Sequence, residues 1–291
     1  IESHTELPLN EGVASTTSVE YRMEFSAAET AALQGLAARV QTTLNIVVQT
    51  AWGLLLKRYG NHDAVVFGTV TSGRPSDLAG VESILGLFIN TVPVVLDVKA
   101  QDDVRELLVR QHTRQVERES HSYYPLYEIQ KLGPLKEGLF SSVFVFENYP
   151  IDKQLQEQGE GRGLQVTHVE TTEGTNYDLA VVAHVSQGLT IRLEGGAGKY
   201  NEASLARIGG HYRRILLGLV AVARVDELEM LSEQERGYLL EELNATAVSY
   251  EQDVLLHELF ERQAEQHPAA IAVVSGEERL SYQTLNEQAN R

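Results

Sequence analysis

The chain has 291 residues, of which 43% are hydrophobic and 22% charged, and its formal net charge is −17. This length fits one large or two modest domains with a sizeable core, and the composition excludes a disordered chain. The 41 acidic against 24 basic residues disfavour nucleic acid and anionic membrane as partners, since both select for clustered lysine and arginine. The absence of cysteine excludes disulfides, thiolate nucleophiles and cysteine-based zinc sites.

The beginning of the chain has no apolar signal-peptide core, and no apolar run reaches the length of about 18 residues that a membrane span needs. These features predict a soluble, cytoplasmic protein. Residues 1–20 are polar and irregular, so we expect a loop that leads into the first domain.

Two helices are predicted next along the chain. Ser26 and Glu29 have the spacing of a capping box, which opens a helix over 26–39. One of two adjacent threonines caps a stronger helix over 42–59. Apolar residues cover much of the circumference of that second helix, and a helix of this kind is normally buried.

Two strands and a further helix follow. The β-branched, apolar segment 64–70 is typical of a buried strand. Segment 88–98 is a second strand region, and Pro93 inside it indicates a sheet edge or a bulge. Asp103 then caps a helix over 103–120.

The remainder of the first domain alternates turns, strands and a long helix. A short helix is expected before Gly133-Pro134, and the helices and strands segregate as in an α/β sandwich, an α+β arrangement. The further expected elements are strands over 141–147, 164–169, 179–185 and 189–194 and an amphipathic helix over 202–222.

A boundary lies between this domain and the end of the chain. Residues 226–252 are expected to be a linker that contains one short helix. A new amphipathic helix begins in 253–291, followed by a strand over 271–274. This tail of about 40 residues is too short to bury a core of its own, so we expect it to pack on a neighbouring domain or to be loosely held.

The histidines do not form a recognisable catalytic motif. None is adjacent to another, and the sequence contains neither a His-Glu-x-x-His zinc pattern nor a Gly-x-Ser-x-Gly elbow. The glycine-rich segment 195–200 lacks the spacing and the hydroxyl residue of a phosphate loop, so it predicts a turn. Gly209-Gly210 predicts close helix packing, because Tyr212 stands where a prosthetic-group attachment site needs serine.

Two polar positions are candidates for a functional role. Asn90 lies within an apolar strand, and a buried asparagine must be hydrogen-bonded. Its side chain therefore either holds neighbouring backbone or faces a solvent-filled channel. His121 lies in a segment rich in aromatic residues around Pro125, which is more typical of a packed loop than of a site.

Residues 21–225 resemble the C-terminal lobe of a condensation domain of nonribosomal peptide synthetases. Segment 85–91 matches the family motif Gly-x-Phe-Val-Asn-Thr with Ile89 in place of valine. Segment 68–75 resembles the strand and loop at the entry of the substrate channel, and segment 140–150 resembles a late core strand. Segment 121–128 is similar to His-Gln-Asp-x-Pro-Phe-Glu, although Ser122-Tyr123 replaces Gln-Asp.

The tail over 253–291 resembles the start of an adenylation domain. Leu280-Ser281-Tyr282 followed by Leu285-Asn286 matches the first core motif of that domain, which is structural. The later adenylation motifs, including the ATP-binding loop, have no counterpart in this sequence. No adenylation activity is therefore expected of this chain.

The resemblance implies one chloramphenicol-acetyltransferase-like lobe of a V-shaped pair. The implied reaction is attack by an aminoacyl amine on an acyl or peptidyl thioester, with both substrates carried on phosphopantetheine arms. The implied partners are donor and acceptor peptidyl carrier domains, the N-terminal lobe and the remainder of the adenylation domain, with no covalently bound cofactor and no metal. Because the paired-histidine motif of the family has no counterpart here, this chain alone is not expected to be catalytic.

The resemblance also implies positions for the substrate channel or the lobe interface, rather than for proton transfer. These positions are Ser72, Arg74, Phe88, Asn90, Thr91, His121 and Asn148.

Three other interpretations remain open. The chain could be a non-catalytic docking or scaffold module of an assembly line, which would bind a carrier protein without turnover. It could be an epimerization domain of the same fold, but the Phe-Ile-Asn-Thr motif and the adenylation start argue against that. It could be a self-contained acyltransferase, but the missing histidine motif and the missing lobe argue against that.

Overall fold

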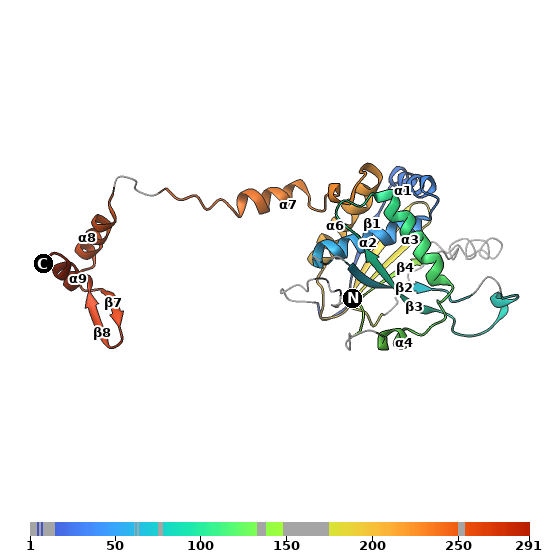
Figure 1. The fold of residues 1–291 in the computed structure, drawn as a ribbon, viewed down its shortest axis with the longest axis horizontal. Coiled ribbons are helices and arrows are strands. Elements are labelled where there is room, and N and C mark those ends of the chain that lie inside the picture. The colour runs from blue at the N-terminus through green and yellow to red at the C-terminus, as the bar shows by residue number, and fades with distance from the viewer. Residues whose placement is uncertain are drawn as a thin grey trace, which may run out of the picture. The chain divides into compact units, whose positions relative to one another are not determined.

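The computed structural model describes residues 5, 7, 15–60, 62, 64–74, 78–132, 138–147, 175–249 and 254–291. Internal contacts divide the chain into two compact units, Ile1–Glu233 and Gln234–Arg291, and each is described by itself. Figure 1 shows the first unit as a sheet covered by helices.

A mixed sheet of six strands forms the centre of the first unit, in the order β1-β6-β5-β4-β2-β3. β4 runs parallel to both β2 and β5, and the other neighbours are antiparallel. The strands are β1 (Val19–Glu24), β2 (Ala64–Thr71), β3 (Asn90–Asp97), β4 (Ser142–Glu147), β5 (Leu179–Val185) and β6 (Leu189–Gly195). The mixed α/β architecture predicted from the sequence is confirmed.

Helices pack against this sheet and share one apolar core with it. Residues from Ile46 to Leu56 in the second of these helices are all buried, which confirms the prediction made from its apolar circumference. The helices of the first unit are α1 (Ala27–Arg39), α2 (Leu44–Gly60), α3 (Val104–Glu119), α4 (Leu126–Lys131) and α6 (Glu202–Ala221), with 3-10 turns at Val81–Ser83 and Val225–Glu227.

The predicted helix starts are visible as hydrogen bonds. Ser26 and Glu29 form both bonds of the capping box of α1. The Asp103 carboxylate accepts from the backbone N–H groups of Arg105 and Glu106 at 2.8 and 3.0 Å. β3 is an edge strand, as the proline at position 93 predicts, because an edge leaves one side of the strand unpaired.

Two segments extend the fold beyond what the sequence predicts. β1 begins at Val19, within the expected lead-in loop, and pairs along its whole length with β6. Thr5 is buried, and its hydroxyl accepts a hydrogen bond from the backbone N–H of Val66 at 3.0 Å. The strand expected over 164–169 lies outside the described residues.

The glycine-rich segments have structural roles in this unit. A Cβ atom on Gly209 would lie 2.4 Å from the ring of Tyr21. α6 can therefore approach β1 closely because this position has no side chain, as the sequence predicts. Segment 195–200 follows β6 as a turn, in which Gly196 donates to the carbonyl of Asp178 at 2.9 Å.

The second unit is small and has little interior. Within 254–291 one residue, Ala264, is buried, which agrees with the expectation that this tail is too short for a core. The strand predicted over 271–274 is confirmed as part of β7. The elements are α7 (Glu233–Gly237), a π-helical turn (Tyr238–Glu242), α8 (Leu256–Gln266), β7 (Ile271–Ser275), β8 (Glu278–Ser281) and α9 (Tyr282–Ala289). In the part of the chain that the structure describes, no helix has both the length and the hydropathy to cross a membrane.

Candidate functional site

Five of the seven predicted site residues lie around the place where β2 ends and β3 begins. The antiparallel register places Thr71 opposite Asn90 and Val70 opposite Thr91. Ser72 follows β2 directly, so the entry loop and the Phe-Ile-Asn-Thr segment meet at one end of this strand pair. The sheet thus joins two motifs that are distant in the sequence.

Arg74 organises the loop that connects the two strands. Its guanidinium donates to the carbonyl oxygens of Val81 and Ile84, the latter at 3.2 Å. The same guanidinium lies over the ring of Phe88, with 4.4 Å between Cζ and the ring centroid. Arg74 therefore fixes the conformation of the loop. A lysine could not replace it, because lysine lacks a planar group with several N–H donors.

Asn90 holds a second loop, which follows α3. Its side-chain N–H group donates to the carbonyls of Ser122 and Tyr124 at 2.8 and 2.9 Å, and its side-chain oxygen accepts from the backbone N–H of Thr91 at 2.9 Å. Of the two roles that the sequence left open for Asn90, the structure shows that it holds neighbouring backbone. The amide side chain fixes the start of β3 to the 121–125 turn.

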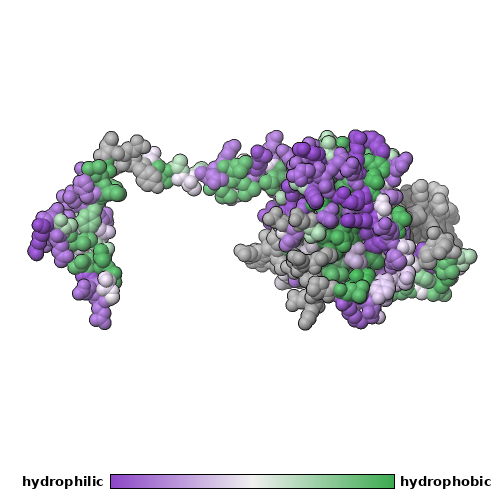
Figure 2. Space-filling model, viewed as in Figure 1, coloured by the Kyte–Doolittle hydropathy of each residue, from purple (hydrophilic) through white to green (hydrophobic). Residues whose placement is uncertain are grey.

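The loop held by Arg74 presents an apolar tip. Leu85 is 98% exposed and Leu87 is 90% exposed, and Ile84 and Ile89 are also exposed. In Figure 1 this teal loop projects beyond the ends of β2 and β3, and Figure 2 shows apolar surface there. Exposed large apolar side chains of this density indicate a surface that contacts another protein or domain.

The remaining predicted positions differ in where they lie. His121 is exposed at the end of α3, and the backbone N–H of Tyr124 donates to its carbonyl at 3.0 Å. Its ring lines a pocket on the side of α3 rather than the loop around Arg74. Asn148 lies outside the described residues.

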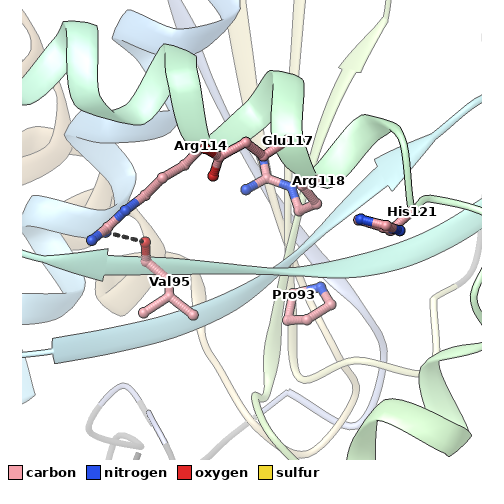
Figure 3. A pocket seen from close by; sticks show the side chains of 6 residues that line it. All are labelled: Pro93, Val95, Arg114, Glu117, Arg118 and His121. Carbon is pink, nitrogen blue, oxygen red and sulfur yellow. Dashed lines mark hydrogen bonds between the residues drawn. The ribbon is translucent and has the colours of Figure 1, made fainter.

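An open pocket of about 510 Å³ lies between α3 and β3 and was not predicted from the sequence. Figure 3 shows its side chains extending from the helix and from the edge strand. The sequence contained a signal for it, because arginines 110, 114 and 118 recur at the spacing of one helix face. The lining residues are Pro93, Val95, Arg114, Glu117, Arg118 and His121.

The polar groups around Arg74 and Asn90 are engaged with backbone carbonyls. Such an arrangement positions loops, and it offers neither a nucleophile paired with a base nor a preorganised oxyanion site. Among the described residues there is also no group of three or more side chains that could hold a metal ion. This arrangement of side chains is suited to shaping a binding surface.

Solved structures share the fold of this chain. A holo four-domain nonribosomal peptide synthetase bound to AMP and glycine matches 99% of this chain with 23% of its own length, at a TM-score of 0.76 and 17% identity. The first condensation domain of the CDA synthetase matches 76% of this chain with 50% of its own length, at a TM-score of 0.60 and 18% identity. The fold is therefore that of condensation domains of nonribosomal peptide synthetases.

The family follows from the sequence comparisons. The family model of the condensation domain matches residues 1–257, so the chain belongs to the condensation domain family. The chain is 35% identical over an alignment of 296 residues to tyrocidine synthase 2 of Brevibacillus parabrevis, covering 100% of this chain and 8% of that protein. It is 35% identical over 292 residues to gramicidin S synthase 2 of Brevibacillus brevis, covering 98% of this chain and 6% of that protein. The chain thus spans less than a tenth of the length of these relatives.

Replacing Asn90 by alanine is expected to loosen the 121–125 turn. The change removes two hydrogen bonds to carbonyl oxygens, each with a net stability of about 0.5–1.5 kcal/mol, so local opening should rise at least about fivefold. Hydrogen exchange of the peptide that contains this turn measures the change. Asn244→Ala is the matched control, because Asn244 also donates to two carbonyls, those of Leu239 and Leu240, in the other unit. Equal exchange of the turn in both variants would show that Asn90 does not hold it.

Proposed function

We propose that this chain is the C-terminal lobe of a condensation domain, followed by the linker and the opening of an adenylation domain, from an elongation module of a nonribosomal peptide synthetase. The observation that carries the proposal is the match to half of a solved condensation domain together with the condensation family match over 1–257. The names of the relatives, which include synthases of gramicidin S and bacitracin, favour a peptide antibiotic as the product of the assembly line.

The reaction that the whole domain performs is amide formation between two carrier-bound substrates. The amine nitrogen of the acceptor attacks the thioester carbon of the donor, a C–N bond forms, the C–S bond breaks, and the amine proton passes to the departing thiolate. Such a reaction needs positioning and proton management more than covalent catalysis. Donor and acceptor phosphopantetheine arms present the substrates, and the paired histidines belong to the N-terminal lobe.

The described residues fit the role of one wall in that arrangement. Arg74 and Asn90 fix two loops at the same end of the sheet, and neither side chain is placed to move a proton to a substrate. The exposed Leu85 and Leu87 at the loop tip provide an apolar surface for the N-terminal lobe. In this proposal Ser72, Phe88 and Thr91 complete the channel wall and the lobe interface.

The adenylation start is supported by how its motif folds. β8 ends at Ser281, and the hydroxyl of Ser281 accepts from the backbone N–H of Thr284 at 3.2 Å to open α9. The ring of Tyr282 packs on Phe260 of α8 at 5.8 Å between centroids. In this proposal the motif has a structural role. The exposed apolar side chains of this segment fit a surface that more of the adenylation domain would cover, including Leu256 and Val274.

The proposal is tested by completing the domain. A donor carrier loaded with an acyl group and an acceptor carrier loaded with an aminoacyl group are incubated with this chain, or with the chain extended upstream by about 180 residues, roughly one lobe of this fold. Intact-protein mass spectrometry follows transfer of the acyl group to the acceptor carrier. We expect product with the extended chain and none with the chain alone.

A variant of the extended chain without the paired histidines of its added lobe serves as the catalytic control. Product from this chain alone would contradict the proposal and would direct attention to His121 and His184. No product in either arm, with loaded carriers that bind the chain, would favour a docking or scaffold module instead. An epimerization domain would invert the donor residue without joining the two substrates, which chiral analysis of the released residue detects.

A further inference from the structure

The six-stranded sheet has its shortest pairing between β2 and β4, which we call the β2–β4 junction. β2 pairs with β3 over eight residue pairs, and β4 pairs with β5 over six. Among the described residues β2 and β4 share two, Gly68 with Val143 and Thr69 with Phe144. Parallel pairing is also slightly less stable per residue than antiparallel pairing. The backbone ladder alone therefore holds this junction weakly.

The β2–β4 junction separates the strands that carry the candidate site from the rest of the sheet. β2 and β3 lie on one side of it, and β4, β5, β6 and β1 lie on the other (Figure 1). β2 leads into the loop that contains Arg74, and β3 begins at Asn90, so both loops of the site are attached to the β2–β3 pair. The separation of the strands at the junction therefore decides where these loops lie relative to β4.

A buried chain of hydrogen bonds crosses the junction on the face that packs against α2. The Thr69 hydroxyl donates to the carbonyl of Phe144 at 3.2 Å, and the side-chain N–H of Gln49 donates to the same hydroxyl at 3.1 Å. Thr69 and Gln49 are both buried. The hydroxyl thus uses its single donor on β4 and one acceptor position on α2. Loss of the hydroxyl would leave a buried amide and a buried carbonyl each without this bond, which is unfavourable.

Thr5 fixes the opposite end of the junction. Its hydroxyl accepts from the backbone N–H of Val66 at 3.0 Å, and its carbonyl accepts from the hydroxyl of Ser141 at 3.3 Å. Val66 lies near the beginning of β2, and Ser141 directly precedes β4. Thr5 therefore joins the beginnings of the two strands, whereas Thr69 joins them nearer the site. Strands that are held at their beginnings can separate only toward the site.

We propose that Thr69 and Gln49 are positioning residues, which set the distance between the β2–β3 pair and β4 and thereby the width of the substrate channel beside Thr71 and Asn90. The inference rests on the proposed function, because this width matters to a reaction only if the two loops line a channel. Condensation joins two substrates that are held in place, and a misplacement of about 1 Å can slow such a reaction about a hundredfold. Neither residue is proposed to touch a substrate.

Hydrogen exchange of the full chain tests the junction without any catalytic activity. Thr69→Val keeps the branched shape and removes both bonds, so exchange of the backbone amides in β2 and β4 should rise at least about fivefold. Thr69→Ser keeps the hydroxyl and should exchange like the unsubstituted chain. Thr190→Val is the matched control, because Thr190 is a buried strand threonine of β6, away from the junction. Circular dichroism checks that all variants fold. Equal exchange at the junction in the two valine variants would overturn the proposal.

The same variants in the chain extended upstream test the effect on the reaction. We expect Thr69→Val and Gln49→Met to lower kcat for condensation by about ten- to a hundredfold with little change in KM for the loaded carriers. Thr69→Ser should recover most of the rate. Faster exchange at the junction with an unchanged kcat would show that the bonds hold the sheet without positioning substrates, which also overturns the proposal. An unsubstituted extended chain without activity would count against the proposed function instead, and the exchange measurement would still decide whether Thr69 holds the junction.

Discussion

Replacing Trp52 by alanine is expected to lower the free energy of unfolding by about 3–5 kcal/mol, the range for truncating a buried aromatic side chain. Trp52 is completely buried in α2. Its ring meets Tyr212 of α6 edge-on at 5.5 Å between centroids, and the Tyr212 hydroxyl donates to the carbonyl of Val48 at 2.9 Å. The substitution would therefore leave a cavity where two helices meet, and the hydrogen bond between Tyr212 and Val48 limits how far the helices can close it.

Urea denaturation of the full chain, followed by circular dichroism, measures this loss; fluorescence does not serve because Trp52 is the one tryptophan in the sequence. Trp52→Phe is the matched control. The indole N–H of Trp52 has no hydrogen-bond partner in the described structure, so phenylalanine keeps most of the aromatic packing and removes no bond. We expect a loss of less than about 1.5 kcal/mol for the control. Equal losses in the two variants would contradict a cavity as the cause.

Much of the first unit follows from local sequence signals. Ser26, Asp103 and Pro93 each determine a feature through their own backbone neighbourhood, a helix start or an edge position, and each feature is present. β1 was not predicted, although Val19, Tyr21 and Met23 alternate with polar residues. That short alternation becomes a strand because β6, far along the chain, supplies its pairing partner.

The candidate site was harder to predict from the sequence than the helices and strands, because it depends on contacts between distant segments. The family motif marked Asn90, but its acceptors are the carbonyls of Ser122 and Tyr124, which only the packing of β3 against the turn after α3 brings within reach. The pocket between α3 and β3 was missed for the same reason. The spacing of arginines 110, 114 and 118 is visible in the sequence, whereas the bonds that Arg110 and Arg114 make to β3 depend on the packing of α3 against the edge of the sheet.

Replacing Gly73 by alanine is expected to force apart the two loops of the candidate site. Gly73 has φ +61°, and a Cβ atom there would lie 1.8 Å from the carbonyl oxygen of Phe88, a backbone atom that no side-chain rotation can move away. The left-handed backbone costs an alanine about 1–2 kcal/mol, and displacing the opposing strand entry adds about 1–3 kcal/mol. The cation–π contact of Arg74 with Phe88 should then be lost as well, since it spans the same gap.

Gly80→Ala separates these two costs. Gly80 also has a positive φ, +77°, but its added Cβ would meet nothing within 4 Å, so this variant carries the backbone strain without the collision. Urea denaturation of both variants, with hydrogen exchange over 78–91, should show a larger loss and faster exchange for Gly73→Ala. In the completed domain, that variant should lose condensation activity while Gly80→Ala retains most of it. If Gly73→Ala behaves like Gly80→Ala in both measurements, the close approach of the entry loop to Phe88 does not shape the site.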